Sequence, residues 1–507
     1  MSFADSLMKE ASYTRTMNGA VAHATTLDEC LDFFAVAGGM RYRSRRDQIA
    51  LFEKAYIANP ELAMKLLFYI RDIRGGLGER QMFRTLIHHV AKMWPESAKK
   101  NVHLISEYGR WDDLLCLLGT KAEAEVVEVV RAQLAKDLDA LKRREAGETD
   151  APISLLAKWL PSDNTSSMVT RANAMLLYDA LGMRRKEYRK AVVALRAQIC
   201  LTENYLTKKQ PQKVNYEAVP SKAMFKYRKA FAKNDEVRFD MYLDKVASKE
   251  KKIHCAALDP YELLKPYFDS STHGGWYSMG SESKGIDKAI EIMWKNMPAE
   301  VRGKNKVCVV DTSGSMYCGL GTGRPIPALV SQALGICFAE RCKGIFHNKI
   351  ITFEETPHVF ELKGNNLHDK LTYLQSAPWG MSTNMEAVFD LILDTAVKSH
   401  AKQKDLPSVI YIISDMEFNC AFRDPNKSVY ENAKEKFEAH GYQLPAVVFH
   451  NVNSWQMQAP VGAHTKGAAL VSGYGTAAFS QEFDGNMTPL SHMLEVLGGK
   501  RYEPVHA

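Results

Sequence analysis

The sequence predicts an α-helical N-terminal domain followed by an α/β domain built on a doubly wound, mostly parallel sheet. Two observations lead to this prediction. From about residue 26 to 296 the apolar residues recur with a helical period. After Pro298, short apolar runs alternate with helical segments, which is typical of a parallel sheet covered by helices on both faces. A chain of 507 residues has room for several domains, and we place the two at 1–300 and 304–507.

The N-terminal domain is expected to be a stack of short helices. One helix starts at Pro60, a second covers 83–90 and stops near Pro95, and a third covers 98–107. A long amphipathic helix spans 126–141. Short helices joined by short turns predict a HEAT-like repeat array, although the sequence has no strict period and does not decide whether the array closes into a ring.

A stretch rich in Gly and Ser at 269–284 predicts a long loop, and the pattern of apolar residues changes after Pro298. The expected strands are 307–310, 349–353, 358–362, 409–413, 446–452 and 468–471, and the expected helices are 326–342, 384–398, 428–440 and 486–497. In such sheets ligands bind beyond the carboxyl ends of the strands. Asp311 and Asp415 follow two of these strand ends, so the sequence predicts a site there.

Polar side chains at this edge form the strongest chemical pattern in the sequence. Asp311, Ser313 and Ser315 make a D-x-S-x-S turn after a buried strand, and Thr383 and Asp415 supply a further hydroxyl and carboxylate. Oxygen donors without Cys or His suit Mg²⁺ or Mn²⁺ rather than zinc. With two serines and few carboxylates, the ion would keep an open position for an outside anionic oxygen.

The run VVDTSGSM at 309–316, with Thr383 and Asp415 after it, resembles the metal-ion-dependent adhesion site of von Willebrand factor A domains. The resemblance covers roughly residues 304–507. It implies that the serines contact the metal directly and the aspartates partly through water. An acidic side chain of a partner, or an internal glutamate such as Glu417, would complete the shell.

Charge is concentrated in one segment of the N-terminal half. The chain has 66 Lys and Arg against 59 Asp and Glu, yet residues 184–252 alone hold 19 basic and 8 acidic residues. Such asymmetry favours a polyanionic partner, and a solvated helical face is the alternative. The candidate RNA-binding cations are Arg184, Arg185, Lys186, Arg189 and Lys190 on one expected helix and Lys222, Lys226, Arg228, Lys229 and Lys233 on another.

Aromatic residues are interleaved with these cations. Proteins that bind single-stranded nucleic acid use cations to contact phosphates and aromatic rings to stack on bases. The rings have an alternative interpretation, because aromatic residues at helical spacing usually belong to the core. The residues concerned are Tyr188, Tyr205, Tyr216, Phe225, Tyr227, Phe231, Phe239 and Tyr242.

Four further motifs extend the resemblance to the N-terminal half: RDIRGGLGER at 71–80, YGRWDDL at 108–114, AKWLPS at 157–162 and VPS at 219–221. They resemble the helical-repeat domain of Ro-type (TROVE) RNA-binding proteins, and more closely an uncharacterised family of related architecture. In Ro proteins the repeats close into a ring that takes single-stranded RNA ends, and a basic outer face holds structured RNA. The resemblance therefore implies RNA binding.

Several classes are excluded or disfavoured. No stretch approaches the apolar length of a membrane span, and the N-terminus is unlike a secretory signal. The nine cysteines show no compact spacing, which favours reduced thiols in a cytoplasmic protein. No nucleophile, base and orienting group assemble in a known motif, so we predict that the protein is not an enzyme.

Three functions remain open at this point. The first is a non-catalytic RNA-binding protein with a Mg²⁺-binding A domain. The second is a protein–protein adaptor whose metal captures a partner carboxylate, as an accessory factor of an ATPase or of a phage or viral assembly. In the third, the metal only holds the fold together. The sequence does not predict the oligomeric state.

Overall fold

The structure is a computed structural model that describes residues 11–199, 202–268, 285–318, 325–378 and 380–507. The chain divides into two compact units. Unit 1 comprises Met1–Arg43 and Leu243–Gly499, and unit 2 comprises Ser44–Tyr242 and Lys500–Ala507. The predicted loop at 269–284 lies outside the described residues.

The division into units differs from the linear boundary predicted near residue 300. The first segment of the chain belongs with the sheet because helix α2 (Glu29–Ala37) is almost entirely buried and packs on strand β8 (Ala468–Ser472). The Ser472 hydroxyl accepts a hydrogen bond from the Gly38 N–H at 2.9 Å and donates one to the Phe34 carbonyl. The sequence of an apolar helix reveals its helical period, but it does not reveal which strand the helix packs against.

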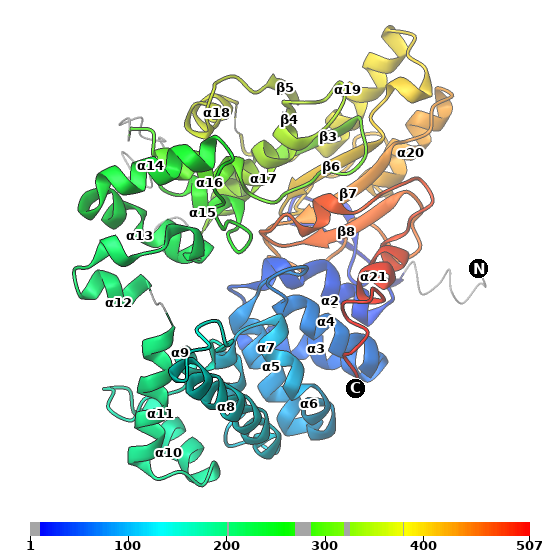
Figure 1. Ribbon diagram of the computed structural model, residues 1–507. Helices are drawn as coiled ribbons and strands as arrows, with labels where there is room; N and C mark the ends of the chain where they lie inside the picture. The colour runs from blue at the N-terminus through cyan, green and yellow to red at the C-terminus, as the bar shows by residue number, and fades with distance from the viewer. Residues whose placement is uncertain (1–10, 200–201, 269–284, 319–324, 379) are drawn as a thin grey trace. The chain divides into compact units, whose positions relative to one another are not determined.

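Unit 1 is built on one six-stranded sheet with the order β5-β4-β3-β6-β7-β8 (Figure 1). All neighbours are parallel except β4 and β5. The predicted mostly parallel sheet is therefore confirmed. The strands are β3 (Lys306–Asp311), β4 (Lys349–Phe353), β5 (His358–Glu361), β6 (Val409–Ser414), β7 (Ala446–Asn451) and β8.

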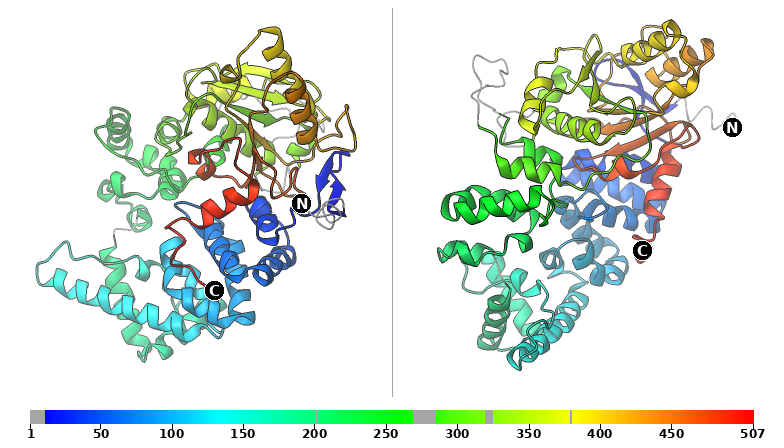
Figure 2. Two further views of the ribbon diagram at one scale, coloured as in Figure 1. Left: turned by 90° about the vertical axis from the view of Figure 1, so that its right-hand side faces the viewer. Right: turned by 45° about the horizontal axis from the view of Figure 1, so that its top comes forward.

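Helices cover both faces of this sheet. Tyr411 of β6 contacts Phe338 of helix α17 (Pro327–Arg341), whereas Phe449 of β7 contacts Tyr430 of helix α20 (Val429–Ala439). Phe449 lies in register with Ile412, and successive residues of a strand point to opposite faces. The two helices therefore lie on opposite faces, as a doubly wound sheet requires (Figure 2).

The remaining helices of unit 1 complete these layers. Helix α18, which the sequence pattern did not indicate, packs on α17. The helices are α15 (Pro260–Leu264), α16 (Lys288–Lys295), α18 (Leu367–Leu374), α19 (Met385–Lys398) and α21 (Pro489–Leu497). Two short strands, β1 (Tyr13–Arg15) and β2 (Val21–His23), form a separate antiparallel hairpin.

Unit 2 is helical in its described residues, as predicted. Helix α4 begins at Pro60, where the Asn59 side chain accepts a hydrogen bond from the Leu62 N–H and caps the helix. The helices are α3 (Arg45–Ala58), α4 (Pro60–Arg71), α5 (Arg80–Met93), α6 (Pro95–Asn101), α7 (Ile105–Tyr108), α8 (Glu123–Glu145), α9 (Leu156–Trp159), α10 (Met168–Ala180), α11 (Arg185–Gln198), α12 (Thr202–Thr207) and α13 (Ser221–Asn234), with α14 (Glu236–Ala247) crossing the division between the units.

A buried ion cluster joins the two longest sequence motifs of unit 2. Asp113 is fully buried and accepts hydrogen bonds from Arg71 Nε at 2.8 Å, Arg84 Nε at 2.6 Å and the Arg110 N–H at 2.9 Å. A Cβ on Gly109 would lie 2.5 Å from the Asp113 carboxylate and 2.7 Å from Arg71 Nε, so only glycine fits there. The motifs therefore build the interior of this unit.

The C-terminal segment extends the same pattern. The buried carboxylate of Asp72 accepts two hydrogen bonds from Arg501, at 2.6 and 2.9 Å, and a third from the Tyr502 hydroxyl at 3.2 Å. The Asn101 side chain accepts a hydrogen bond from the His506 N–H. These contacts explain why Lys500–Ala507 belongs to unit 2 although it follows the sheet in the chain.

Two buried histidines, His450 and His492, are expected to reduce the stability of unit 1 in acid. His450 lies between the Tyr411 hydroxyl and the Gly473 carbonyl, each 2.8 Å away, and burial lowers its pKa to about 4. Burial also lowers the pKa of His492 to about 4. Unfolded histidine titrates near 6.5, so protons bind the unfolded chain first. The stability that these two histidines contribute is complete above about pH 6.5 and falls as the pH drops toward 4.

We expect each histidine to cost about 1 kcal/mol of unfolding free energy when the pH falls from about 7.5 to 5.5. Urea unfolding of the wild type and of His450→Gln at both pH values measures this, because glutamine keeps polar partners without titrating. The variant should lose less stability than the wild type. Equal losses would contradict the assignment to His450.

Candidate functional site

The sheet brings the two predicted aspartates to one edge. Asp311 is the last residue of β3, and Asp415 follows the end of β6, which is the parallel neighbour of β3. The Ser414 hydroxyl donates a hydrogen bond of 2.5 Å to Asp311 Oδ2. Because adjacent parallel strands end at the same edge, their last polar residues share one site.

The hydroxyl residues lie in two turns beside these aspartates. The Ser313 N–H donates to Asp311 Oδ1 at 2.8 Å, and the hydroxyl oxygens of Ser313 and Ser315 are 3.2 Å apart. Ser313 pairs with Gly380 in a β-bridge, which places the loop that carries Thr383 beside the serine turn. The structure therefore brings the predicted ligands together.

Contacts with the loop after β6 hold Thr383 in place. Its N–H donates to Asn419 Oδ1 at 3.2 Å, and its carbonyl accepts from the Asn419 N–H at 3.0 Å. The next residue, Asn384, caps helix α19 by accepting from the Ala387 N–H. Thr383 is thus fixed by a helix start on one side and by the Asp415 loop on the other.

The electrostatics of this cluster fit a divalent cation. Asp311 and Asp415 are only 1% and 2% exposed. Burial raises the pKa of both carboxyls, and the charge of Asp311 further raises the pKa of Asp415. Asp415 Oδ2 is buried and has no hydrogen-bond partner among the described residues. A buried, unpaired carboxylate oxygen is costly unless a cation neutralises it, and two carboxylates with three hydroxyls suit Mg²⁺ or Mn²⁺.

Glu417, which the sequence left open as an internal ligand, has both carboxylate oxygens engaged elsewhere. Oε2 accepts from the Met17 N–H at 2.9 Å, and Oε1 accepts from Gln458 Nε2 at 2.9 Å. Glu417 is 3% exposed. Its side chain therefore binds the N-terminal hairpin and Gln458 rather than any of the five predicted ligands.

Within the described ranges, no group of three or more His, Cys, Asp or Glu side chains is arranged to hold a metal ion. The five predicted ligands do not form such a group because three of them are hydroxyls. In the part of the chain that the structure describes, no helix has the length and apolar character needed to span a membrane.

The five predicted cations of the first basic helix lie at and within α11. All five are exposed, but three are paired with acidic residues. Arg184 pairs with Glu187, and both Arg185 and Arg189 pair with Asp163. Lys186 and Lys190 are exposed on the same helix, and neither forms an ion pair within the described part of the chain. The positive charge of this helix is therefore partly neutralised by the protein itself.

Helix α13 carries four of the five predicted cations of the second basic helix at its surface. Lys222, Lys226, Lys229 and Lys233 are exposed at spacings of four, three and four residues, which places them on one face of the helix. They span about 16 Å along the helix axis. The helix contains no Asp or Glu. We call these four residues the lysine stripe.

Arg228 is the exception on α13. It is 7% exposed, donates to the Phe225 carbonyl at 2.6 Å and lies 4.4 Å from the centre of the Phe225 ring. The buried position removes Arg228 from the candidate surface. Its predicted role in RNA contact is not supported, because the guanidinium packs inside the unit.

Most of the aromatic residues that the sequence placed among the cations belong to the core. Tyr216 contacts Phe231, Phe239 and Tyr242, with ring centroids 5.1 to 5.3 Å apart. Tyr188 is 1% exposed and donates to the Pro161 carbonyl. Phe225, Tyr227 and Tyr205 are half-buried. The core interpretation is therefore right for the five buried rings, which cannot stack on bases.

The sequence did not indicate that the N-terminal hairpin contacts one of the predicted cation ligands. Asn18 Nδ2 lies 3.4 Å from Thr383 Oγ1 and 2.6 Å from the Glu417 carbonyl. These partners are more than 360 residues away in the chain. No local pattern could have revealed them.

Comparison with known proteins finds similarity over nearly the full chain. An uncharacterized protein of Acanthamoeba polyphaga mimivirus is 28% identical over 535 aligned positions, covering 98% of this chain and 89% of its own length. The crystal structure of the Ro (RSR) protein of Deinococcus radiodurans is similar over 94% of this chain and 100% of its own, with 16% identity and a TM-score of 0.41. A likeness this distant transfers no property of that protein to this chain.

Two family models match adjoining parts of the sequence. Residues 305–487 match a domain of unknown function, DUF7788, and residues 16–132 and 124–307 match a second domain of unknown function, DUF2828. The second match covers more than half of the 507 residues. The chain therefore belongs to the family described as domain of unknown function DUF2828.

Proposed function

We propose that the protein is a non-catalytic RNA-binding protein that contacts phosphates through the lysine stripe of α13 and holds a Mg²⁺ ion in its α/β unit. The observation that supports RNA binding best is the stripe itself: four exposed lysines on one face of a helix without acidic residues. Lysine charges at this spacing attract a phosphate backbone without reading its sequence. The resemblance of the sequence motifs to Ro-type proteins points to the same ligand.

The way in which the protein would contact RNA follows from which side chains are exposed. The buried rings of this region pack between the helices, so they are not available to stack on bases. Affinity would then come from phosphate contacts, which release counterions and depend strongly on salt. We therefore expect a preference for RNA shape and charge over sequence, with α11 contributing through Lys186 and Lys190.

The role proposed for the ion is structural. Asp311, Ser313, Ser315, Thr383 and Asp415 would bind Mg²⁺, whose charge offsets that of the two buried carboxylates. The second candidate, an adaptor that captures a partner carboxylate, is less well supported. The rim of the cluster already contacts Asn18 of the same chain, which leaves less room for an outside ligand.

Charge reversal of the stripe tests the proposal. Lys226→Glu combined with Lys229→Glu and Lys233→Glu should weaken binding of a labelled single-stranded RNA by about 100-fold at low salt. The slope of log K against log salt should fall by about 2, since each lost contact on a single strand removes about 0.7. Fluorescence anisotropy across a salt series measures both quantities.

The matched control carries the same charge change on unit 1. Lys398, Lys402 and Lys404 are exposed, and their triple change to Glu alters net charge equally. This control should keep most of its affinity and its salt slope. Equal losses in the two triple variants would contradict a role for the stripe and leave only a nonspecific effect of net charge.

A further inference from the structure

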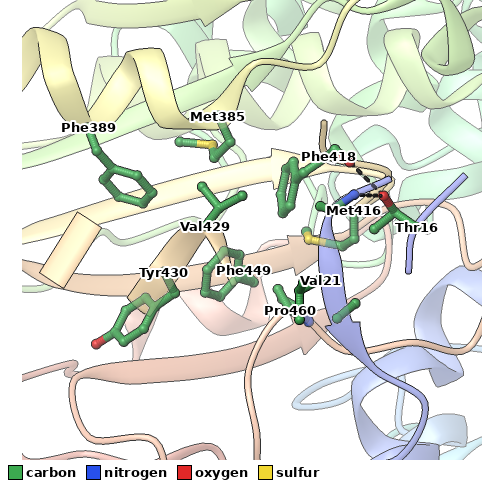
Figure 3. A pocket seen from close by; sticks show the side chains of 12 residues that line it. Thr16, Val21, Met385, Phe389, Met416, Phe418, Val429, Tyr430, Phe449 and Pro460 are labelled. Carbon is green, nitrogen blue, oxygen red and sulfur yellow. Dashed lines mark hydrogen bonds between the residues drawn. The ribbon is translucent and has the colours of Figure 1, made fainter. Parts of the chain in front are cut away.

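The narrow cavity beside the N-terminal hairpin of unit 1 is apolar. Phe389, Phe418 and Phe449 are among the side chains that line it (Figure 3), and none of the described residues around it is charged. This cavity therefore has no group that would bind an anion. The ion cluster around Asp113 in unit 2 differs from it, because that cluster brings together cations of three sequence motifs.

Three guanidinium groups share two carboxylates in this cluster. Asp113 forms ion pairs with Arg71 at 2.7 Å and with Arg84 at 2.6 Å. Asp112 forms ion pairs with Arg84 at 2.7 Å and with Arg110 at 2.9 Å. Arginine stays charged in proteins, so one positive charge has no carboxylate of its own.

Two more cations lie beside these ion pairs. Arg80 precedes Arg84 by one turn of α5, is exposed, and forms no hydrogen bond or ion pair with the described residues. Desolvation and the positive charges of Arg110 and Arg84 lower the pKa of Arg80. The Trp159 ring carries the other cation, because Arg110 Cζ lies 4.1 Å and Lys158 Nζ 5.5 Å from its centre.

We call this group the arginine cluster. It has five cations against two carboxylates and consists of Arg71, Arg80, Arg84, Arg110, Asp112, Asp113, Lys158 and Trp159. An excess of three positive charges over so few residues favours an anion, and the planar guanidinium matches the oxygens of phosphate.

The cluster also has polar atoms without a partner. Arg110 Nε, a donor, and Asp112 Oδ1, an acceptor, are both buried and form no hydrogen bond with the described residues. The side chains of Arg84 and Arg110 are partly exposed, so solvent and small ligands reach the cluster. Unpaired buried polar groups are costly, which favours a ligand that pairs with both a donor and an acceptor.

Hydrogen phosphate has this combination of groups. It is a dianion that accepts hydrogen bonds from guanidinium groups, and it keeps one O–H that can donate to a carboxylate. Sulfate has a similar shape and charge but carries no proton at neutral pH, so it would leave Asp112 Oδ1 unpaired. In a nucleotide, a ribose hydroxyl next to the phosphate could donate to Asp112 instead.

We propose that the arginine cluster is a binding site for a phosphate group, either inorganic phosphate or the phosphate of a nucleoside monophosphate. Arg80, Arg84 and Arg110 contact the phosphate oxygens, and Asp112 accepts a hydrogen bond from a hydroxyl of the ligand. This inference depends neither on the proposed metal ion nor on the lysine stripe.

Calorimetric titration of the full chain with inorganic phosphate tests the site. We expect Arg80→Gln to weaken phosphate binding by about 10-fold, since one charged contact is lost. Arg80→Lys keeps the charge and should stay within about 3-fold of the wild type. Arg46→Gln removes an exposed arginine of α3 and is the control, which should bind phosphate like the wild type.

Sulfate distinguishes phosphate recognition from a general attraction of anions. At pH 7.5 and constant ionic strength, we expect the wild type to bind phosphate at least about 10-fold more tightly than sulfate, because an unpaired acceptor rejects a ligand that lacks the donor. Asp112→Asn should bind the two anions about equally, since its amide offers a donor as well as an acceptor.

Adenosine 5′-monophosphate identifies the source of the phosphate group. Tighter binding of this nucleotide than of inorganic phosphate assigns the site to nucleotides, and weaker or equal binding assigns it to inorganic phosphate. In both cases Arg80→Gln should reduce the affinity.

Three results would overturn the inference. The first is that the wild type binds neither ligand at millimolar concentration. The second is that Arg80→Gln and Arg46→Gln have the same phosphate affinity. The third is that the wild type binds phosphate and sulfate equally well.

Discussion

Asp311→Asn is expected to abolish stabilisation by Mg²⁺ without destabilising the metal-free protein. In the metal-free state the change removes one of two buried carboxylates whose negative charges repel each other. The asparagine oxygen can still accept a hydrogen bond from the Ser313 N–H or the Ser414 hydroxyl. A cation at this position would lose a charged ligand and the neutralisation that favours its binding.

Thermal or urea unfolding with chelator and with Mg²⁺ measures this effect. For the wild type, Mg²⁺ at 100 times its Kd should add about 2.7 kcal/mol to the unfolding free energy. For Asp311→Asn the gain should fall close to zero. Asp394→Asn is the matched control, because Asp394 is exposed and forms only a surface ion pair with Lys398. A variant that keeps the full Mg²⁺ effect would contradict the assignment of Asp311.

Asp113→Ala is expected to lower the stability of unit 2 by about 3 to 5 kcal/mol. Asp113 is fully buried and forms ion pairs with Arg71 and Arg84. Arg71 is itself only 2% exposed. Its removal leaves the Arg71 guanidinium buried without its counter-charge, which costs far more than the loss of a surface pair. Urea unfolding followed by helical circular dichroism gives the change.

The control for this prediction is Asp139→Ala. Asp139 forms an exposed pair with Arg143 at 3.9 Å on α8, and such pairs contribute between zero and about 1 kcal/mol. The two substitutions remove the same atoms from the same unit. A loss below about 1 kcal/mol for Asp113→Ala would mean that Arg71 finds another partner and that the motifs do not depend on this cluster.

The sheet was predictable because its parallel strands are buried on both faces. Strands such as β3, β4 and β7 are continuous apolar runs bounded by polar residues, so their ends could be placed within about two residues. Asp311 and Asp415 followed from the same pattern, since the ends of neighbouring parallel strands converge. The position of the two serine hydroxyls beside Asp311 was predictable because Ser313 and Ser315 lie within one turn of that residue.

What the sequence did not reveal depends on contacts across long separations. Helix α2 packs on β8, and the hairpin tip reaches Thr383 and Glu417 some 400 residues later. The helical period of the aromatic residues on α13 and α14 was compatible with base stacking and with a core. Burial decided in favour of the core, because Phe231 and Phe239 pack around Tyr216.

The measurement that tests RNA binding most directly is purification at low salt, with absorbance at 260 and 280 nm followed by nuclease treatment. We expect nuclease-sensitive RNA to accompany the wild-type protein and to be released steeply as salt rises. The triple variant at Lys226, Lys229 and Lys233 should elute without RNA. A wild-type protein that is free of nucleic acid and also fails to bind added single-stranded RNA would contradict the proposed RNA binding.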